Sequence, residues 1–203
     1  MKKIISFILS ALLCLNITIP TFAKESSENN SKIECISITN LETGESFVLD
    51  SNMIKSNTTI SDTGDIEKEI VAEISIPQAA ARNSVTDAGV TVKITLNLDY
   101  ITSGTQYKLK TVSGSFEVLD NAFSISNRHV KIGNFDNSCL DNIYDKYPGS
   151  TFSYTFNDRW VDSSYWPTIV GAYAECTMSR STSSWSVRCT NIPVQNGMDL
   201  TVM

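Results

Sequence analysis

The sequence contains few of the residues that most catalytic and metal sites require. Its 203 residues include a single histidine, His129, and five cysteines. A Ser-His-Asp or Cys-His arrangement needs only one histidine, but the chain has neither a G-x-S-x-G motif nor a catalytic-cysteine signature. We therefore predict no catalytic residue and interpret His129 as a surface residue. Because transition-metal sites usually combine several His or Cys ligands, we also predict no metal, and we predict no cofactor.

The chain also lacks any cluster of positive charge. It has 16 Lys and Arg against 22 Asp and Glu, with a formal net charge of -6. Nucleic acids and anionic lipid surfaces bind clustered Lys and Arg, so we predict no nucleic-acid partner. Carboxylates are plentiful instead. A glycoside hydrolase needs two of them about 5–9 Å apart, and the sequence does not identify such a pair.

Only one long apolar run is present, and it lies at the N-terminus. Lys2 and Lys3 precede the apolar segment from Ile4 to Leu15, and Thr21-Phe22-Ala23 offers small residues around a cleavage point. This pattern is typical of a secretory signal peptide of bacterial type, cleaved after Ala23. No later run approaches the roughly 20 residues of a membrane span. We therefore predict a secreted, extracellular protein without a transmembrane segment, whose mature net charge is -8 once both lysines are removed.

Export makes disulfides the first interpretation of the cysteines. Four remain after cleavage: Cys35, Cys139, Cys176 and Cys189. If the C-terminal hairpin turns at Thr182-Ser183, Cys176 lies opposite Cys189 on one face, at a separation that a disulfide accepts. Cys35 and Cys139 form the second predicted bridge by elimination.

The clearest structural signal is the stretch from Gly89 to Tyr100. Apolar residues from Val90 to Tyr100 alternate with polar ones, as in a strand with one buried face. Gln106 to Leu119 follows as its partner, with a change of phase that predicts a bulge near Lys110-Thr111 or a break at Ser113-Gly114. Phe123 to Ile132 resembles a short hairpin in its pattern.

Similar alternation recurs along the chain at short spacing, without a convincing helix or an internal repeat. We predict an all-β fold: a single antiparallel β-sandwich, Ig-like or jelly-roll-like, of about seven to nine strands, with a barrel as the alternative. The predicted organisation is a signal peptide at 1–23, a polar leader with a hairpin and a linker at 24–82, and the β-sandwich domain at 83–203.

One aromatic segment stands out as a candidate binding site. Trp160, Tyr165 and Trp166 lie in a polar, turn-like stretch, and loops on a sandwich are where binding residues usually sit. Exposed aromatic side chains stack on sugar rings or anchor a protein partner. The alternative is that both tryptophans cover the end of the core.

The first functional hypothesis is therefore a non-enzymatic binding module for a glycan, the cell wall or a surface protein. An extracellular hydrolase is the alternative. A secreted peptide or toxin-like effector processed near Arg82 is a further one.

Overall fold

In the computed structural model, described residues are 31–49, 54–74, 91–138, 142–156 and 159–200. They form twelve strands and no helix long and apolar enough to cross a membrane. The strands are β1 (Ser31–Asn40), β2 (Ser46–Val48), β3 (Ile54–Ile60), β4 (Asp65–Ile74), β5 (Val92–Ser103), β6 (Gln106–Val118), β7 (Ser124–Asp136), β8 (Ile143–Lys146), β9 (Thr151–Thr155), β10 (Val161–Asp162), β11 (Thr168–Arg180) and β12 (Ser183–Asn196). The predicted signal peptide lies outside these residues.

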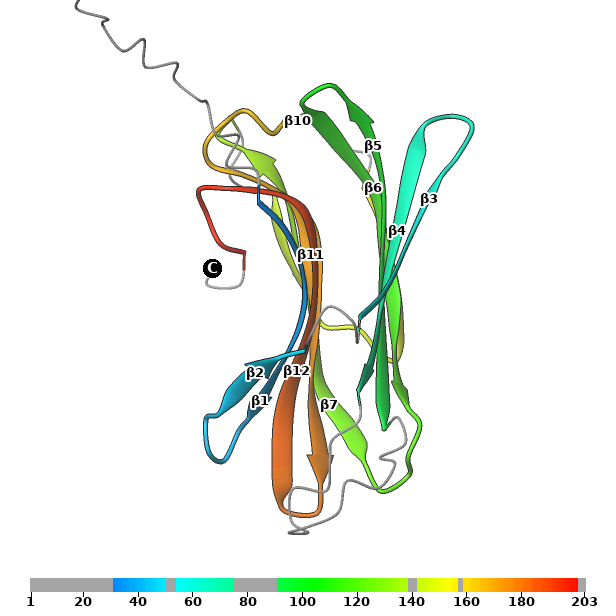
Figure 1. Cartoon of the computed structure of the whole chain (residues 1–203), viewed down its shortest axis with the longest axis vertical. Coiled ribbons are helices and arrows are strands. Elements are labelled where there is room, and N and C mark those ends of the chain that lie inside the picture. The colour runs from blue at the N-terminus through cyan, green and yellow to red at the C-terminus, as the bar shows by residue number, and fades with distance from the viewer. Residues whose placement is uncertain (1–30, 50–53, 75–90, 139–141, 157–158, 201–203) are drawn as a thin grey trace, which may run out of the picture.

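The strands form two antiparallel sheets that face each other (Figure 1). The first sheet has the order β2-β1-β12-β11-β7-β8, and the second has the order β10-β6-β5-β4-β3, with β9 paired to β6. The sheets do not close into a barrel. The predicted all-β sandwich is thus confirmed, with more strands than the seven to nine expected.

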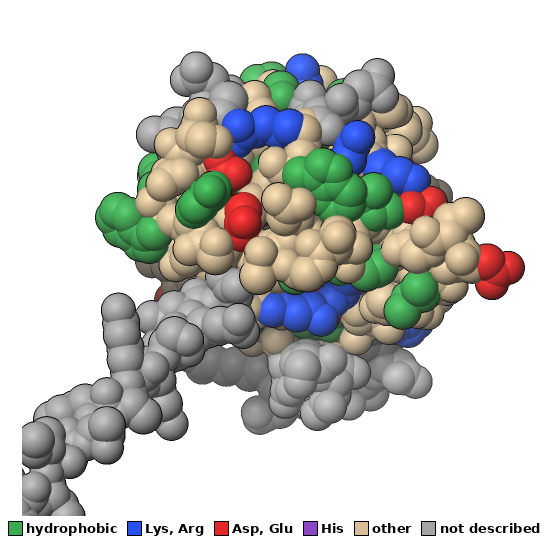
Figure 2. All heavy atoms as spheres, turned by 90° about the horizontal axis from the view of Figure 1, so that it is seen from above, with side chains coloured by type: hydrophobic (Ala, Val, Ile, Leu, Met, Phe, Trp, Pro, Cys, Tyr) green, Lys and Arg blue, Asp and Glu red, His purple; other side chains and the backbone are tan. Residues whose placement is uncertain are grey.

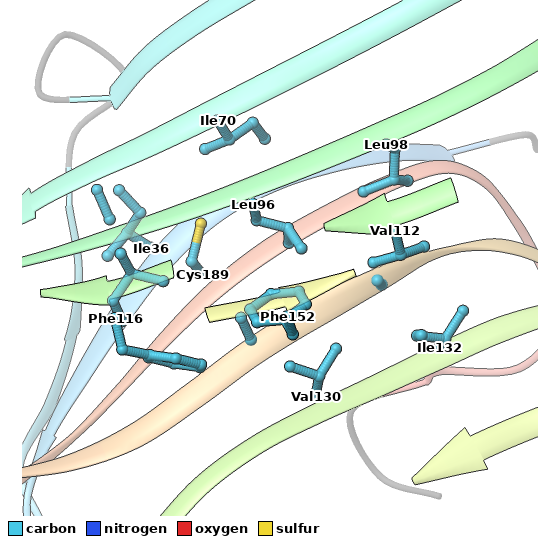
Figure 3. Packing of buried hydrophobic residues seen from close by; sticks show 14 of the residues in the cluster. Ile36, Ile70, Leu96, Leu98, Val112, Phe116, Val130, Ile132, Phe152 and Cys189 are labelled. Atoms are coloured by element: carbon cyan, nitrogen blue, oxygen red, sulfur yellow. The ribbon is translucent and has the colours of Figure 1, made fainter. Parts of the chain in front are cut away.

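The core lies between the two sheets and follows from the alternation in the sequence. In β5 every second side chain from Val92 to Tyr100 is buried, as the pattern predicts. Figure 3 places Leu96 and Val112 of the second sheet against Val130 and Ile132 of the first. Burial of such side chains contributes about 1.5–3 kcal/mol each.

Both sheets draw strands from the N-terminal part of the chain. Residues 31–74 supply β1 and β2 to the first sheet and β3 and β4 to the second. The linker expected within 24–82 corresponds to residues 51–65. It contains β3, which pairs with β4 from Ile54↔Ala72 to Ile60↔Ile66. The predicted boundary at residue 82, and Arg82 itself, lie outside the described residues.

Two bulges account for the phase changes in the pattern. In β6 the register passes from Asp99↔Thr111 to Tyr100↔Leu109, so Lys110 is the extra residue and the predicted bulge is confirmed. In β7 the predicted hairpin is wrong, because the chain continues as one strand. Asn127 and Arg128 lie there opposite a single residue of β11, and a bulge of this kind reverses side-chain parity as a turn does.

The predicted Cys176–Cys189 disulfide is wrong. The hairpin turns at Ser181-Thr182, one residue earlier than expected, so Cys176 lies opposite Val187 and Cys189 opposite Ala174. A shift of the turn by one residue moves the pairing by two, which keeps both cysteines on the buried face. Cys35, Cys176 and Cys189 are free thiols, while Cys139 lies outside the described residues.

Candidate functional site

The aromatic segment forms a loop around β10 at one end of the sandwich. Its three large aromatic side chains are exposed to solvent: Trp160 by 38%, Tyr165 by 46% and Trp166 by 67%. Between them, Val161 points into the core and is fully buried. Figure 2 views this end of the molecule, where hydrophobic side chains lie on the surface between polar and charged ones. The core is therefore closed by Val161 while the aromatic rings face solvent.

The backbone of this loop is tied to both sheets. β10 pairs with the start of β6 through Val161↔Tyr107. The Ser163 amide donates to the carbonyl oxygen of Thr105, in the β5–β6 turn, at 2.9 Å. On the other side, the hydroxyl of Thr168, the first residue of β11, donates to the carbonyl oxygen of Tyr165 at 2.7 Å. These bonds hold the loop on both sides of its exposed aromatic residues.

Asp162 gives the loop its turn. Its Oδ1 accepts hydrogen bonds from the Ser164 amide at 2.9 Å and from the Ser164 hydroxyl at 2.7 Å. Asp and Asn side chains favour this local turn because they bond the backbone two residues on. The bonds from Ser164 hold the pKa of Asp162 below its ordinary value.

A buried carboxylate at the end of β7 anchors the start of the loop. Asp136 Oδ1 accepts hydrogen bonds from Arg159 Nη2 at 2.6 Å and from the Ser138 hydroxyl at 2.6 Å, and Asp136 Oδ2 accepts one from the Asp162 amide at 3.2 Å. Burial alone would raise the pKa of Asp136, but these bonds outweigh it and keep the pKa below its ordinary value. The side chain therefore joins β7, Arg159 and β10 as an ionised acceptor.

Trp166 is supported from beneath by the chain after β12. Gly197 lies so close to the indole that a Cβ added there would fall 2.1 Å from Trp166 Nε1. Next to it, Asn196 Nδ2 donates to the Tyr165 carbonyl oxygen at 3.0 Å. The indole thus lies against the backbone of Gly197, while Trp166 is 67% exposed to solvent.

A second candidate site is a polar hollow on the outer face of the second sheet. It has a volume of about 560 Å³, and its lining residues are Thr59, Ile60, Ser61, Asp65, Glu67, Asn97, Asp99, Thr111 and Ser113. Burial raises the pKa of Asp99, and the neighbouring carboxylates add to this while Lys110 opposes it. Glu67 and Asp99 are direct register partners on β4 and β5. The Oδ1 atom of Asn97 is buried there without a hydrogen-bond partner.

His129 lies elsewhere, on the outer face of the first sheet. Its Nε2 lies 2.8 Å from Asp145 Oδ1, and its ring stacks on Tyr147 with centroids 5.0 Å apart. The Tyr173 ring meets it edge-on at 5.6 Å. These contacts account for the packing of the imidazole between strands β7, β8 and β11.

No group of three or more His, Cys, Asp or Glu side chains in the described part of the chain is arranged to hold a metal ion. No protein-family model, curated protein or solved structure matches the chain. The candidate sites are therefore judged on their geometry alone.

Sequence reasoning found the three aromatic residues but not the groups that hold them. The Asp- and Asn-rich sequence from Asp136 to Asp145 is typical of a solvated acidic loop, whereas Asp136 ends β7 as a buried acceptor. Its partner Arg159 comes 23 residues later. One signal was available, since Asp136 continues the alternation of β7 and stands next to the apolar Phe135.

Proposed function

We propose that the protein is a secreted, non-enzymatic binding module that recognises an extracellular polysaccharide through Trp160, Tyr165 and Trp166. The observation that carries the proposal is the combination of exposure and support at one loop. The aromatic rings face solvent, while the backbone that bears them is bonded to β6, β7, β11 and the end of β12.

Pre-organisation is the physical reason why this combination favours binding. Ordering a flexible loop on binding costs about 0.5–1.5 kcal/mol for each immobilised side chain, which a loop already fixed does not lose. Tyr and Trp present a large rigid face with few rotatable bonds. Such faces suit the C–H surfaces of sugar rings, and Ser164 and Asp162 supply polar groups beside them.

Charge supports a neutral polymer as the ligand. The predicted mature chain carries a net charge of -8, which repels strongly anionic polymers at a distance. A neutral glycan avoids that repulsion and binds through stacking and hydrogen bonds.

The test is binding of the mature protein to purified cell walls and to a panel of neutral and anionic glycans. We expect retention on at least one neutral glycan, and loss of retention in Trp166→Ala. Tyr147→Ala is the matched control, because Tyr147 is 78% exposed on a different face. Equal retention of wild type and Trp166→Ala on every ligand would refute the proposal.

An extracellular hydrolase is the second candidate, favoured by Glu67 and Asp99 in the hollow on the second sheet. Residues directly opposite each other on antiparallel strands have Cβ atoms about 4.5–5.5 Å apart, and paired carboxyl groups about 5–9 Å apart are the machinery of glycoside hydrolysis. The raised pKa of Asp99 suits a general acid. Release of reducing sugar by wild type, abolished in Asp99→Asn, would establish this activity, and its absence from all glycans tested would exclude it.

A further inference from the structure

A lysine is buried between the two sheets. Lys68 lies on the inward face of β4, the same face as Ile70 and Ala72, and only 2% of its surface is exposed. Its Nζ pairs with Glu34 Oε1, which comes from β1 in the opposite sheet. The Lys68 side chain therefore reaches from one sheet to a carboxylate of the other, and the Glu34 side chain is 23% exposed.

An asparagine from a third strand meets this pair. Asn191 of β12 is fully buried, and its Nδ2 donates to the backbone carbonyl oxygen of Lys68 at 3.4 Å. Asn191 and Glu34 are direct register partners on β12 and β1. The Oδ1 atom of Asn191 has no hydrogen-bond partner although it is buried. An amine, a carboxylate and a primary amide are thus brought together from β4, β1 and β12.

Stability alone does not account for this cluster. A buried ion pair commonly contributes no more than apolar side chains of the same volume, because removing both charges from water costs as much as their attraction returns. An unpaired buried amide oxygen adds a further cost. An amine and a primary amide are instead two groups that can form an amide bond between side chains, and a carboxylate beside them can transfer protons.

The surroundings shift Lys68 toward the uncharged amine, while the hydrogen bonds from Lys32 and Lys68 outweigh burial and lower the pKa of Glu34. Burial lowers the pKa of Lys68; the ion pair with Glu34 opposes this, while Lys32, which is 2.8 Å from the same Glu34 oxygen, lowers the pKa further. A neutral amine is a nucleophile and an ammonium is not. Transfer of one proton from Lys68 to Glu34 yields that amine together with a protonated carboxylic acid beside it.

We propose that Lys68 and Asn191 join in an intramolecular isopeptide bond, with Glu34 transferring the protons. Glu34 takes a proton from the Lys68 ammonium, and Lys68 Nζ attacks Asn191 Cγ. The protonated Glu34 donates a hydrogen bond to the developing oxyanion at Oδ1. The Cγ–Nδ2 bond then breaks as Glu34 returns this proton to the leaving nitrogen. Nζ loses its second proton through the Glu34 carboxylate to the departing ammonia, so that ammonium is released and Glu34 is again a carboxylate. The new bond is Nζ–Cγ, and no oxidant is consumed.

Such a bond would fasten β4 in the second sheet to β12 in the first. The described cysteines are free thiols, so this link would supply the covalent cross-bridge that disulfides supply in many exported proteins. It would also join the chain on either side of Arg82. Cleavage at that residue would then leave both parts covalently attached.

Peptide mapping of the folded, reduced and alkylated protein tests the proposal. Trypsin does not cut after an acylated lysine, so we expect one branched peptide in which residues 56–82 are joined to residues 189–203, lighter than the sum of the two by one ammonia. Recovery of 56–68, 69–82 and 189–203 as separate peptides, with no branched product, would overturn it. This readout on the wild-type protein decides the question whether or not a variant folds.

Three variants assign the roles. Glu34→Gln keeps both reacting groups and is expected to lose or slow formation of the branched peptide. Asn191→Asp is expected to form it with loss of water in place of ammonia. Lys110→Gln is the matched control, because it removes a lysine that pairs with a different carboxylate, Asp65 of β4, and leaves the cluster of Lys68, Glu34 and Asn191 untouched. A folded Glu34→Gln protein that cross-links as fast as wild type would overturn the role of Glu34.

Discussion

Trp166 rests on the backbone of Gly197, where a Cβ would lie 2.1 Å from the indole Nε1. This contact fixes the most exposed of the three candidate binding side chains. Gly197 also has φ +86°, a conformation that side chains rarely adopt. Two features therefore favour glycine at this position: the positive φ of its backbone and the lack of space for a Cβ beside the indole.

Gly197→Ala should displace the indole and weaken glycan binding by about tenfold or more, because the aromatic face is no longer held in place. Gly44→Ala is the control. It has φ +72° and nothing within 4 Å of an added Cβ, so it carries a similar backbone cost without touching the loop. Equal binding by both variants would show that the support from Gly197 is immaterial.

Asp136→Asn should loosen the start of the aromatic loop. The amide accepts fewer bonds from Arg159, Ser138 and the Asp162 amide, so we expect the free energy of unfolding to fall by about 1–3 kcal/mol. Because the pKa of Asp136 is lowered by folding, its contribution is present above about pH 4 and is lost as the pH falls through the lowered pKa.

Urea unfolding at pH 7 and at pH 3 measures both effects. The difference between wild type and Asp136→Asn should be large at pH 7 and smaller at pH 3. A difference that grows on acidification would contradict this assignment.

The buried thiols should make the fold sensitive to alkali. Burial raises the pKa of Cys176 to about 12 and raises that of Cys189 as well. The folded chain then holds these protons more tightly than the unfolded chain. The thiols therefore leave the free energy of unfolding unchanged below about pH 8.5 and reduce it as the pH rises further. Both thiols should also resist alkylation at neutral pH until the protein is unfolded.

A Cys176→Ala/Cys189→Ala variant should be less stable at pH 7 but lose less stability than wild type between pH 8.5 and pH 11. Tyr100 and Tyr173, whose pKa values burial also raises, remain in both proteins, so the comparison isolates the thiols. Parallel curves for the two proteins would contradict the assignment.

Gly114 of β6 lies where the packing leaves no room for a side chain. An added Cβ would lie 2.0 Å from the Thr95 carbonyl oxygen and 2.7 Å from Phe152 Cζ. Gly114→Ala should therefore destabilise the protein by about 3 kcal/mol or more, since overpacking against backbone has little room to relax. Gly149→Ala, with open space around it, should change the melting temperature little. Equal melting temperatures for the two variants would contradict the packing described for β5, β6 and β9.

The sequence predicted which face of a strand is buried better than it predicted which residues pair across strands. Alternation identifies which side chains point inward, and it did so for β5 and for both cysteines of the C-terminal hairpin. Parity does not separate a bulge from a turn, so the strand through Asn127 was interpreted as a hairpin. Nor does it fix a turn to one residue, which displaced Cys176 from Cys189.

For the candidate sites, too, the sequence identified residues that are close in the chain but not contacts between distant ones. Trp160, Tyr165 and Trp166 were found because they are adjacent in a polar segment. The contact of Arg159 with Asp136 depends on tertiary structure, as does that of Lys68 with Glu34 and Asn191. Residues far apart in the chain meet only through strand order, and local patterns do not encode strand order.

The most direct test of the central claim is the affinity of the mature protein for its retained glycan, measured by titration for wild type and Trp166→Ala. Covering a large apolar side chain contributes about 1.5–3 kcal/mol, so we predict a rise in Kd of about tenfold to a hundredfold with an unchanged melting temperature. The same Kd for both proteins would contradict recognition through the aromatic loop.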